Sequence, residues 1–329
     1  MASAASTDGA GAHSGGGNAT GAMITAGAGW EAAFRRLCLA ASLVLMIGLG
    51  ALILSLAIGG WPAFARFGPA FLVTNVWDPV SDQFGAAGPI VGTLVTASLA
   101  LLMALPLAIG VAIFLTEFCP PRIAQPLGVA VELLAGIPSI VYGMWGLFVL
   151  APWFAGHVQG PLAASAEPGS LLAGVLAGVP NGANIFTASL VLAIMILPYI
   201  ASVFRELLLA VPAQMREAAY GIGCTSYEVI GSIMIPYVRR SAIGAVMLGL
   251  GRALGETMAV TFIIGNSHAF PKGLFDAGST IASTIANEFT EATDELHVAS
   301  LFALGLVLFV ITFASIAGAR LLLIGERVR

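Results

Sequence analysis

The chain has 329 residues, of which 58% are hydrophobic and only 9% carry a charge. Soluble globular domains carry roughly 25% charged residues, so this composition excludes an ordinary soluble protein and indicates a membrane protein. The formal net charge of −4 decides little, because in a membrane protein the placement of charges matters more than their sum.

The N-terminal stretch, residues 1–33, is rich in glycine, alanine, serine and threonine. Such a segment buries too little apolar surface to become ordered. We therefore expect a disordered cytoplasmic tail over residues 1–33, followed by a single transmembrane domain over residues 34–329.

Six apolar stretches are long enough to cross a membrane, which takes about 20 helical residues. The expected spans are residues 37–60, 90–115, 127–154, 185–204, 242–264 and 298–324. Pro106, Pro138 and Pro198 lie inside three of them, where neighbouring helices can satisfy the freed carbonyls or the prolines can act as hinges. The expected fold class is an all-α, polytopic integral membrane protein with six transmembrane helices.

The basic residues are distributed unevenly on the two sides of these spans. Ten lie on the side that holds both termini and the segment 212–238, whereas only Arg66 and Lys272 lie on the other side. Because basic residues concentrate on the cytoplasmic side, we expect both termini in the cytosol. The two long loops, residues 156–184 and 266–296, would then face outward.

The segment 212–238, between the fourth and fifth spans, is typical of two short helices joined by a turn. Pro212 can begin the first helix and Gly223 can end it in a left-handed conformation. Thr225 and Glu228 have the spacing of a capping box, which predicts the start of the second helix.

This second helix repeats apolar residues at helical spacing, and we interpret that face as a docking surface. The face consists of Ile230, Ile233, Met234, Tyr237 and Val238. Pro236 is expected to break or kink the helix just before the fifth span.

Apart from Arg320 near the cytosolic end of the sixth span, three charged residues lie inside the expected spans: Glu132, Arg252 and Glu256. Arg252 follows Ala242 by about 15 Å along a helix, near the midplane of a hydrocarbon core about 30 Å thick, and Glu256 would follow one turn later on the same face. A lone charge there costs about 2.5–3.5 kcal/mol. The two residues either only neutralise each other, with the shallower Glu132 as an alternative partner, or line a substrate path.

The chain lacks the residues of several enzyme classes. It has no Gly-x-x-x-x-Gly-Lys-Ser/Thr phosphate-binding loop, so it is not an ATPase, and it has no nucleophile elbow or His-Glu-x-x-His motif. Its four histidines and three cysteines show no metal-ligand spacing. We expect no metal site, no cofactor and no enzymatic activity of its own.

Two groups of residues carry a resemblance to a known family. In order and spacing, the residues Glu217, Ala218, Ala219, Gly223, Ile233 and Pro236 resemble the cytoplasmic coupling loop of ABC importer permeases. The stretches 251–260 (GRALGETMAV) and 132–146 resemble the phosphate-specific, PstC-type branch of that family. The resemblance runs from about residue 34 to residue 325, and Ile235 replaces the leucine that the family has before the loop's last proline.

The resemblance implies the architecture of a type I ABC importer permease that moves inorganic phosphate across a bacterial inner membrane. It implies a second homologous permease, two cytosolic ATPase subunits that hydrolyse ATP, an extracytoplasmic phosphate-binding protein, surrounding membrane lipid and no nucleic acid. The six loop residues would couple to the ATPase, and Arg252, Glu256 and Glu132 would belong to the substrate path.

Three alternatives remain at this point. The chain could be a permease for another oxyanion, such as molybdate or sulfate. It could be a secondary transporter driven by an ion gradient, although such a transporter has no ATPase for a coupling loop to contact. A passive channel would need pore-lining polar repeats, which the sequence does not contain.

Overall fold

The structure is a computed structural model, and it describes residues 17–167 and 169–325. The chain divides into two units, Met1–Ser55 and Leu56–Arg329. The described residues of the first unit belong to helix α1, Gly17–Phe67, which continues into the second unit. We describe the second unit by itself from here on.

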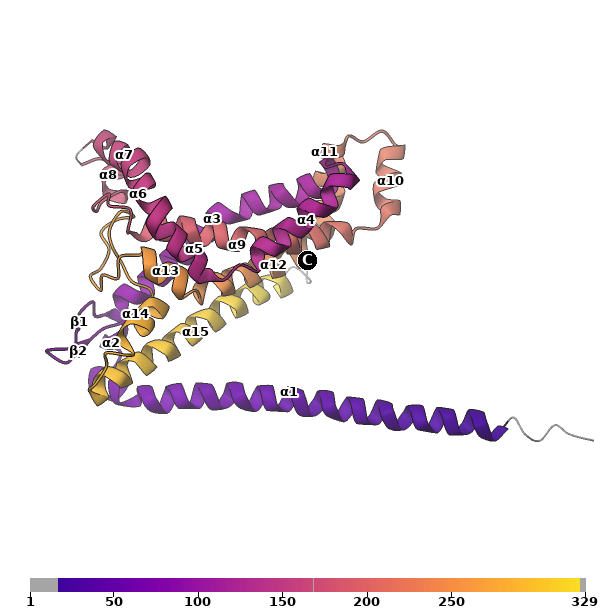
Figure 1. Cartoon of the computed structure of the whole chain (residues 1–329), viewed down its shortest axis with the longest axis horizontal. Coiled ribbons are helices and arrows are strands. Elements are labelled where there is room, and N and C mark those ends of the chain that lie inside the picture. Colours follow the sequence, from indigo (N-terminus) through magenta and orange to yellow (C-terminus); the bar gives the residue numbers. More distant parts are fainter. Residues whose placement is uncertain (1–16, 168, 326–329) are drawn as a thin grey trace, which may run out of the picture. The chain divides into compact units, whose positions relative to one another are not determined.

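The remaining elements follow in chain order and are drawn in Figure 1. They are α2 Ala70–Val73, β1 Trp77–Asp78, β2 Gln83–Phe84, α3 Ala87–Ile113, the π-helical turn η1 Phe114–Phe118, α4 Pro121–Ala135, α5 Ser139–Trp145, the π-helical turn η2 Gly146–Leu150, α6 Ala151–Phe154, the π-helical turn η3 Ala155–Gln159, α7 Gly160–Ser165, α8 Leu171–Val175, α9 Ile185–Leu209, α10 Ala213–Gly221, α11 Ser226–Val229, the π-helical turn η4 Ile230–Met234, α12 Ile235–Leu254, α13 Met258–Ile263, α14 Ile281–Glu288 and α15 Glu295–Gly325.

Helix α1 begins well before the expected first span. Of the tail that we expected to be disordered, residues 1–33, the part from Gly17 onward is helical, and residues 1–16 lie outside the described residues. Alanine, the strongest helix former, is the most frequent residue in this part. The high helix propensity of alanine explains why this part is helical, although its composition led us to expect disorder.

Among the described residues, six helical stretches are long and apolar enough to cross a membrane, as the sequence predicts. These stretches are Ala33–Phe67, Ala87–Phe118, Ser139–Ser165, Ile185–Leu209, Ser226–Leu254 and Glu295–Gly318. The third and fifth differ most from the expected ranges, 127–154 and 242–264, because a helix break interrupts each of those ranges.

The break in the third range lies between α4 and α5. Pro138 precedes α5 and has no N–H to donate into a continuous helix. The Tyr142 hydroxyl donates to the Leu134 carbonyl at 3.0 Å, which satisfies one acceptor that the end of α4 leaves free. The segment before the break, α4, is therefore a separate helix, whereas α3 and α9 continue through Pro106 and Pro198.

The centre of the second unit is the pair α3 and α9, which pack along most of their lengths. Their contact buries a row of small residues at spacings of three and four along α3, which lets two helices approach closely. The row consists of Ala97, Ala100, Ala104, Ala108 and Ala112, each at most 1% exposed. Helix α12 joins the pair at Gly249, where an added Cβ would lie 2.7 Å from a methyl carbon of Ile200.

Part of the expected polar loop 266–296 is packed inside the fold. Thr280 and Ser283 form a capping box at the start of α14, and the first residues of this helix are buried. The Thr93 hydroxyl on α3 accepts a hydrogen bond from the Ile281 N–H at 2.9 Å. Gly92 is required at this contact, because the carbonyl oxygen of Ser279 occupies the place of a Cβ. In the sequence, polar residues such as Thr280 and Ser283 make this segment look like a loop. In the structure they cap the start of α14.

A cluster of aromatic and ionisable side chains joins the hairpin β1–β2 to α14 and α15. The Trp77 ring stacks on His268 with a centroid distance of 5.7 Å, and Phe84 stacks on His297 at 5.1 Å. The Glu288 carboxylate lies 3.2 Å from Nε2 of each histidine. These contacts position a two-stranded hairpin that is too short to be stable alone.

A second polar network is fully buried near the start of α9. The Gln159 amide donates to the Thr187 hydroxyl at 2.8 Å and accepts from the Asn184 side chain at 3.0 Å and the Gly182 N–H at 3.1 Å. Gln159, Asn184 and Thr187 are each 0% exposed. The network connects the end of η3 to the N-terminus of α9.

We predict that Gln159→Leu destabilises the protein, because it leaves several buried polar groups without a partner. Each such group costs about 1–3 kcal/mol, and a thermal unfolding measurement on the purified protein should register the loss. Gln214→Leu, at an exposed position of α10, is the control. An equal melting temperature for Gln159→Leu and wild type would contradict this prediction.

Candidate functional site

The segment 212–238 forms the helix–turn–helix that its sequence predicts. Helix α10 starts directly after Pro212 and ends at Gly221, and Gly223 has a φ of +92°. The Cys224 N–H donates to the Ala219 carbonyl at 3.1 Å, and the Gly223 N–H donates to the Tyr220 carbonyl at 3.0 Å. This pair of bonds is a Schellman motif, and the left-handed backbone at its turn favours glycine.

The second helix of this segment begins with the predicted capping box. The Thr225 N–H donates to the Glu228 carboxylate at 2.8 Å, and the Glu228 N–H donates back to the Thr225 hydroxyl at 3.4 Å. Of the prediction that Pro236 breaks or kinks the helix, the break is wrong. Helix α11 runs through the π-turn η4 into α12 without interruption, and Pro236 is the second residue of α12.

The interpretation of the apolar face as a docking surface is also wrong for most of its residues. Ile230, Met234 and Val238 are at most 6% exposed and belong to the chain's own core. Apolar residues at helical spacing predict a buried face, and the spacing does not say whether the same chain or a partner covers it. The exposed side chains of this segment lie elsewhere, with Ile222 and Tyr227 each 84% exposed.

The predicted coupling residues differ in exposure. Glu217 and Ala218 are exposed on α10, and Gly223 is exposed at the turn, together with Pro236 in the first turn of α12. Ala219 is 3% exposed and Ile233 is half-buried, and both pack in the core. The exposed surface of this segment therefore includes the outer face of α10, the turn and the start of α11.

One ion pair in this region was not predicted from the sequence. Arg216 on α10 lies 2.6 Å from the Glu117 carboxylate on η1, and the Glu117 side chain is only 4% exposed. A buried carboxylate needs a charged partner, so this pair holds α10 against the end of the second span. An acidic residue at the end of an apolar helix was the only sequence signal, and its partner is 99 positions away.

The structure changes the expected relation between Arg252 and Glu256. Helix α12 ends at Leu254, so Arg252 lies in its last turn, whereas Glu256 lies in the break before α13. The Glu256 carboxylate accepts a hydrogen bond from the Ala259 N–H at 3.2 Å, at the start of α13. The two residues are therefore not one turn apart on a continuous helix, and no ion pair joins them in the described part of the chain.

The side chain of Arg252 is exposed and lies over an aromatic ring. Its guanidinium carbon lies 5.9 Å from the ring centroid of Tyr199 on α9, within the range of a cation–π contact. This arrangement leaves the N–H groups of the arginine available to another ligand.

The third predicted residue, Glu132, has a different partner. Its carboxylate lies 3.5 Å from Arg205 on α9, which also lies 3.2 Å from Glu206. The Arg205 guanidinium lies over Gly128, where an added Cβ would be 2.9 Å from its central carbon. The structure thus brings Glu132 to Arg205 and gives no contact of Glu132 with Arg252 or Glu256.

The two helix breaks lie at the starts of two helices that pack against each other. Helix α5 follows the break at 136–138, and α13 follows the break at 255–257. An added Cβ at Gly143 on α5 would lie 2.9 Å from the Ala259 Cα on α13. The two sequence stretches that resemble the phosphate-specific branch therefore meet in space.

Comparison with known proteins gives consistent results. No model of a protein family matches the chain. The "Phosphate transport system permease protein PstC" of Mesorhizobium japonicum is 52% identical over 296 residues, which cover 89% of this chain and 90% of the relative. The protein of the same name in Haemophilus influenzae is 50% identical over 295 residues, covering 89% and 93%.

A similarity at the level of fold extends to solved structures. A bacterial alginate ABC transporter, crystallised with its alginate pentasaccharide-bound periplasmic protein, superposes with a TM-score of 0.57 at 17% sequence identity. The match covers 88% of this chain and 95% of that chain, and it concerns the fold alone. The chain has the fold of a type I ABC importer permease, and by its identity to these relatives it belongs to the PstC family of phosphate transport system permease proteins.

Proposed function

We infer that the chain is the permease subunit of an ATP-driven importer that moves inorganic phosphate across the cytoplasmic membrane. The observation that carries this inference is the 52% identity to a PstC permease along nine-tenths of both chains. The chain is a multi-pass membrane protein of the inner membrane, and ABC permeases are not themselves enzymes. ATP hydrolysis is therefore assigned to a partner subunit.

The proposed complex contains this chain, a second homologous permease, two cytosolic ATPase subunits and an extracytoplasmic phosphate-binding protein. We place both termini and the segment 212–238 in the cytosol, because ten basic residues lie on that side and two on the other. The hairpin β1–β2, α8 and α14 lie at the opposite end of the second unit from α10 and α11 (Figure 1). They would face the binding protein.

The coupling proposal rests on how the segment 212–238 is attached. The ATPase would contact Glu217, Ala218 and the turn at Gly223, which are exposed. Arg216 ties α10 to η1 and thereby to α3. The path from Ser226 to Leu254 is one uninterrupted helical stretch of 29 residues, about 43 Å long. A displacement at the turn would therefore move α3, α9 and α12 as a rigid body.

We propose that Arg252 and Glu256 line the path of the anion. Counted from Arg240 at the membrane surface, Arg252 lies about 18 Å deep, close to the midplane of a 30 Å core. The Arg252 guanidinium offers a planar set of donors that suits phosphate oxygens. Glu132 pairs with Arg205, which lies four residues before the cytosolic end of α9, so this pair would lie at the inner end of the path.

The chemistry of this pair favours phosphate over the alternative oxyanions. At neutral pH phosphate retains at least one proton, whereas sulfate and molybdate are fully ionised. An ionised carboxylate is an acceptor only. Glu256 can therefore accept a hydrogen bond from a phosphate hydroxyl, but it repels an anion that has none.

The coupling role of the turn can be tested with two glycines. Gly223 has a φ of +92°, whereas Gly221 lies in the last turn of α10, and neither has an atom within 4 Å of an added Cβ. We predict that Gly223→Val abolishes phosphate-stimulated ATP hydrolysis by the purified complex, because a β-branched residue cannot keep the left-handed turn. Gly221→Val should retain most of it.

Comparing Gly223→Val with Gly221→Val separates the effect of the turn geometry from the effect of side-chain size. Both variants place valine on the exposed surface of the same segment, and both should insert into the membrane normally. Stimulation of the Gly223→Val complex to the wild-type rate would show that the turn is not the coupling element. Stimulation by molybdate or sulfate in place of phosphate would contradict the assigned cargo.

The ion pair between α10 and η1 gives a second test. Arg216→Met leaves the Glu117 carboxylate buried without a partner, which costs about 3–5 kcal/mol, so the melting temperature should fall. The double variant Arg216→Met with Glu117→Met should recover most of the stability, because two apolar residues replace a buried pair. We expect stimulated ATP hydrolysis to stay low in both, because α10 is no longer tied to α3 by the pair.

The control for this experiment is Arg122→Met, since Arg122 is exposed and has no ion pair among the described residues. It should match wild type in both measurements. Normal stimulation of the stable double variant would mean that the pair contributes to folding and not to coupling.

The path proposal is tested by replacing both charges at once, so that neither is left alone in the membrane. The double variant Arg252→Met with Glu256→Gln should assemble with its ATPase and hydrolyse ATP at the basal rate. We expect its uptake of labelled phosphate to fall at least tenfold, since a charge-assisted hydrogen bond contributes about 1.5–3 kcal/mol. Arg320→Met, at an exposed arginine of α15, is the control. Normal uptake by the double variant would show that Arg252 and Glu256 have only a structural role.

A further inference from the structure

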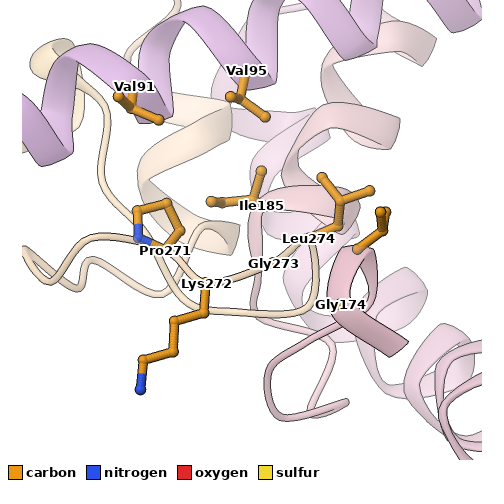
Figure 2. Close-up of a pocket in the computed structure, with 9 residues that line it drawn as sticks. Val91, Val95, Gly174, Ile185, Pro271, Lys272, Gly273 and Leu274 are labelled. Carbon is orange, nitrogen blue, oxygen red and sulfur yellow. The ribbon is translucent and has the colours of Figure 1, made fainter. Parts of the chain in front are cut away.

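A groove lies between α3 and the loop 271–274, which carries Lys272, the only lysine of the chain. A cavity of about 330 Å³ lies between Val91 and Val95 on α3, Ile185 at the start of α9 and the loop 271–274 (Figure 2). A neighbouring hollow of about 410 Å³ shares Val95 and Leu274 with it and continues to Leu102. The two hollows therefore form one groove, which we call the α3 groove.

The α3 groove follows a single stripe of the helix. Val91, Val95, Ser98 and Leu102 repeat at spacings of four, three and four, so they lie on one face. From Val91 to Leu102 the groove is about 16 Å long, and one leaflet of a bilayer has a hydrocarbon depth of about 15 Å. Its length fits one acyl chain that runs from the membrane surface to the midplane.

The mouth of the groove is held in place by backbone hydrogen bonds. The Leu274 N–H donates to the Val175 carbonyl of α8 at 2.8 Å, and the Phe186 N–H of α9 donates to the Leu274 carbonyl at 2.9 Å. The Lys272 N–H donates to the Asp276 carboxylate at 3.1 Å. These bonds hold the loop against α8 and α9, so the loop forms one wall of the groove.

The charge at this mouth is that of Lys272. It is the only lysine of the chain and, among the residues that the structure describes, the only charged one that lines the groove. Its side chain points out of the loop, away from Val91 and Val95 (Figure 2). A lysine at a membrane surface extends its ammonium group to the level of the lipid phosphates. Asp276, beside it, would face the ammonium or hydroxyl groups of a headgroup.

We propose that the α3 groove binds a phospholipid, with one acyl chain along Val91, Val95, Ser98 and Leu102 and its phosphate on Lys272. A free phosphate ion is a poor occupant, because the groove offers one exposed ammonium beside otherwise apolar walls and such anions need several donors. The proposal requires only that the chain is embedded in a membrane, so it does not depend on the cargo or the coupling of the transporter.

The test is lipid retention by the purified transporter complex. The complex is stripped of lipid in detergent, supplied with phosphatidylglycerol and analysed by native mass spectrometry. We expect one tightly held lipid on the wild-type complex. Lys272→Glu should weaken binding at least fivefold, which corresponds to about 1 kcal/mol for one basic residue at the surface. Arg66→Glu, at the other basic residue on that side, should not weaken it.

A second pair of variants tests the apolar part of the groove. Gly174 lines the cavity and has no atom within 4 Å of an added Cβ, so Gly174→Leu should fill the groove and abolish retention. Gly156 has equal space but does not line the groove, so Gly156→Leu should retain the lipid. Ser98→Phe fills the groove from α3 and provides the same test if Gly174→Leu fails to fold.

Three results would overturn the proposal. The first is equal lipid retention by Gly174→Leu, Ser98→Phe and wild type. The second is displacement of the lipid by inorganic phosphate, which would make Lys272 a site for the free ion. The third is efficient cross-linking of a cysteine at Ser98 to the second permease, which would show that a partner helix fills the groove.

Discussion

The close packing of α3 on α9 is the contact on which the rest of the second unit depends. In a bilayer, helices gain little from burying apolar surface, so association relies on close van der Waals contact. The alanine row from Ala97 to Ala112 provides that contact, because it allows the two backbones to approach along most of their lengths. Helix α12 joins at Gly249 for the same reason. Helices α5, α12 and α13 all pack on α9.

The lipid bilayer also restricts where functional sites can lie in such a protein. Backbone groups that leave a helix inside a membrane must find partners within the protein, so irregular backbone persists there only where it is packed or lines a cavity. The breaks at 136–138 and 255–257 satisfy this condition. Tyr142 donates to the end of α4, and Glu256 accepts from the start of α13. Half-helices that begin inside a membrane are typical of transport sites.

The sequence predicted the local structure well where a few neighbouring residues decide it. The six spans, the left-handed Gly223 and the Thr225–Glu228 capping box depend on length, on one glycine or on a three-residue spacing. It failed where a distant part of the chain decides. The Arg216–Glu117 pair joins residues 99 positions apart, and the face of Ile230 and Met234 is buried by the chain's own core.

The helix breaks form an intermediate case. Pro138 in the third range carried a signal for an interruption, but Pro106 and Pro198 carry the same signal in helices that continue. Whether a proline ends a membrane helix depends on which neighbours can satisfy the freed carbonyls. That information lies in the tertiary structure, so the relation of Arg252 to Glu256 could not be read from their spacing.

The central claim is that this chain moves phosphate at the expense of ATP, through helices that move together with the segment 212–238. The most direct measurement is uptake of labelled phosphate into proteoliposomes that contain the full complex, with the binding protein outside. We expect uptake that requires ATP on the cytosolic side and is insensitive to collapse of ion gradients. Uptake driven by an ion gradient without ATP would contradict it.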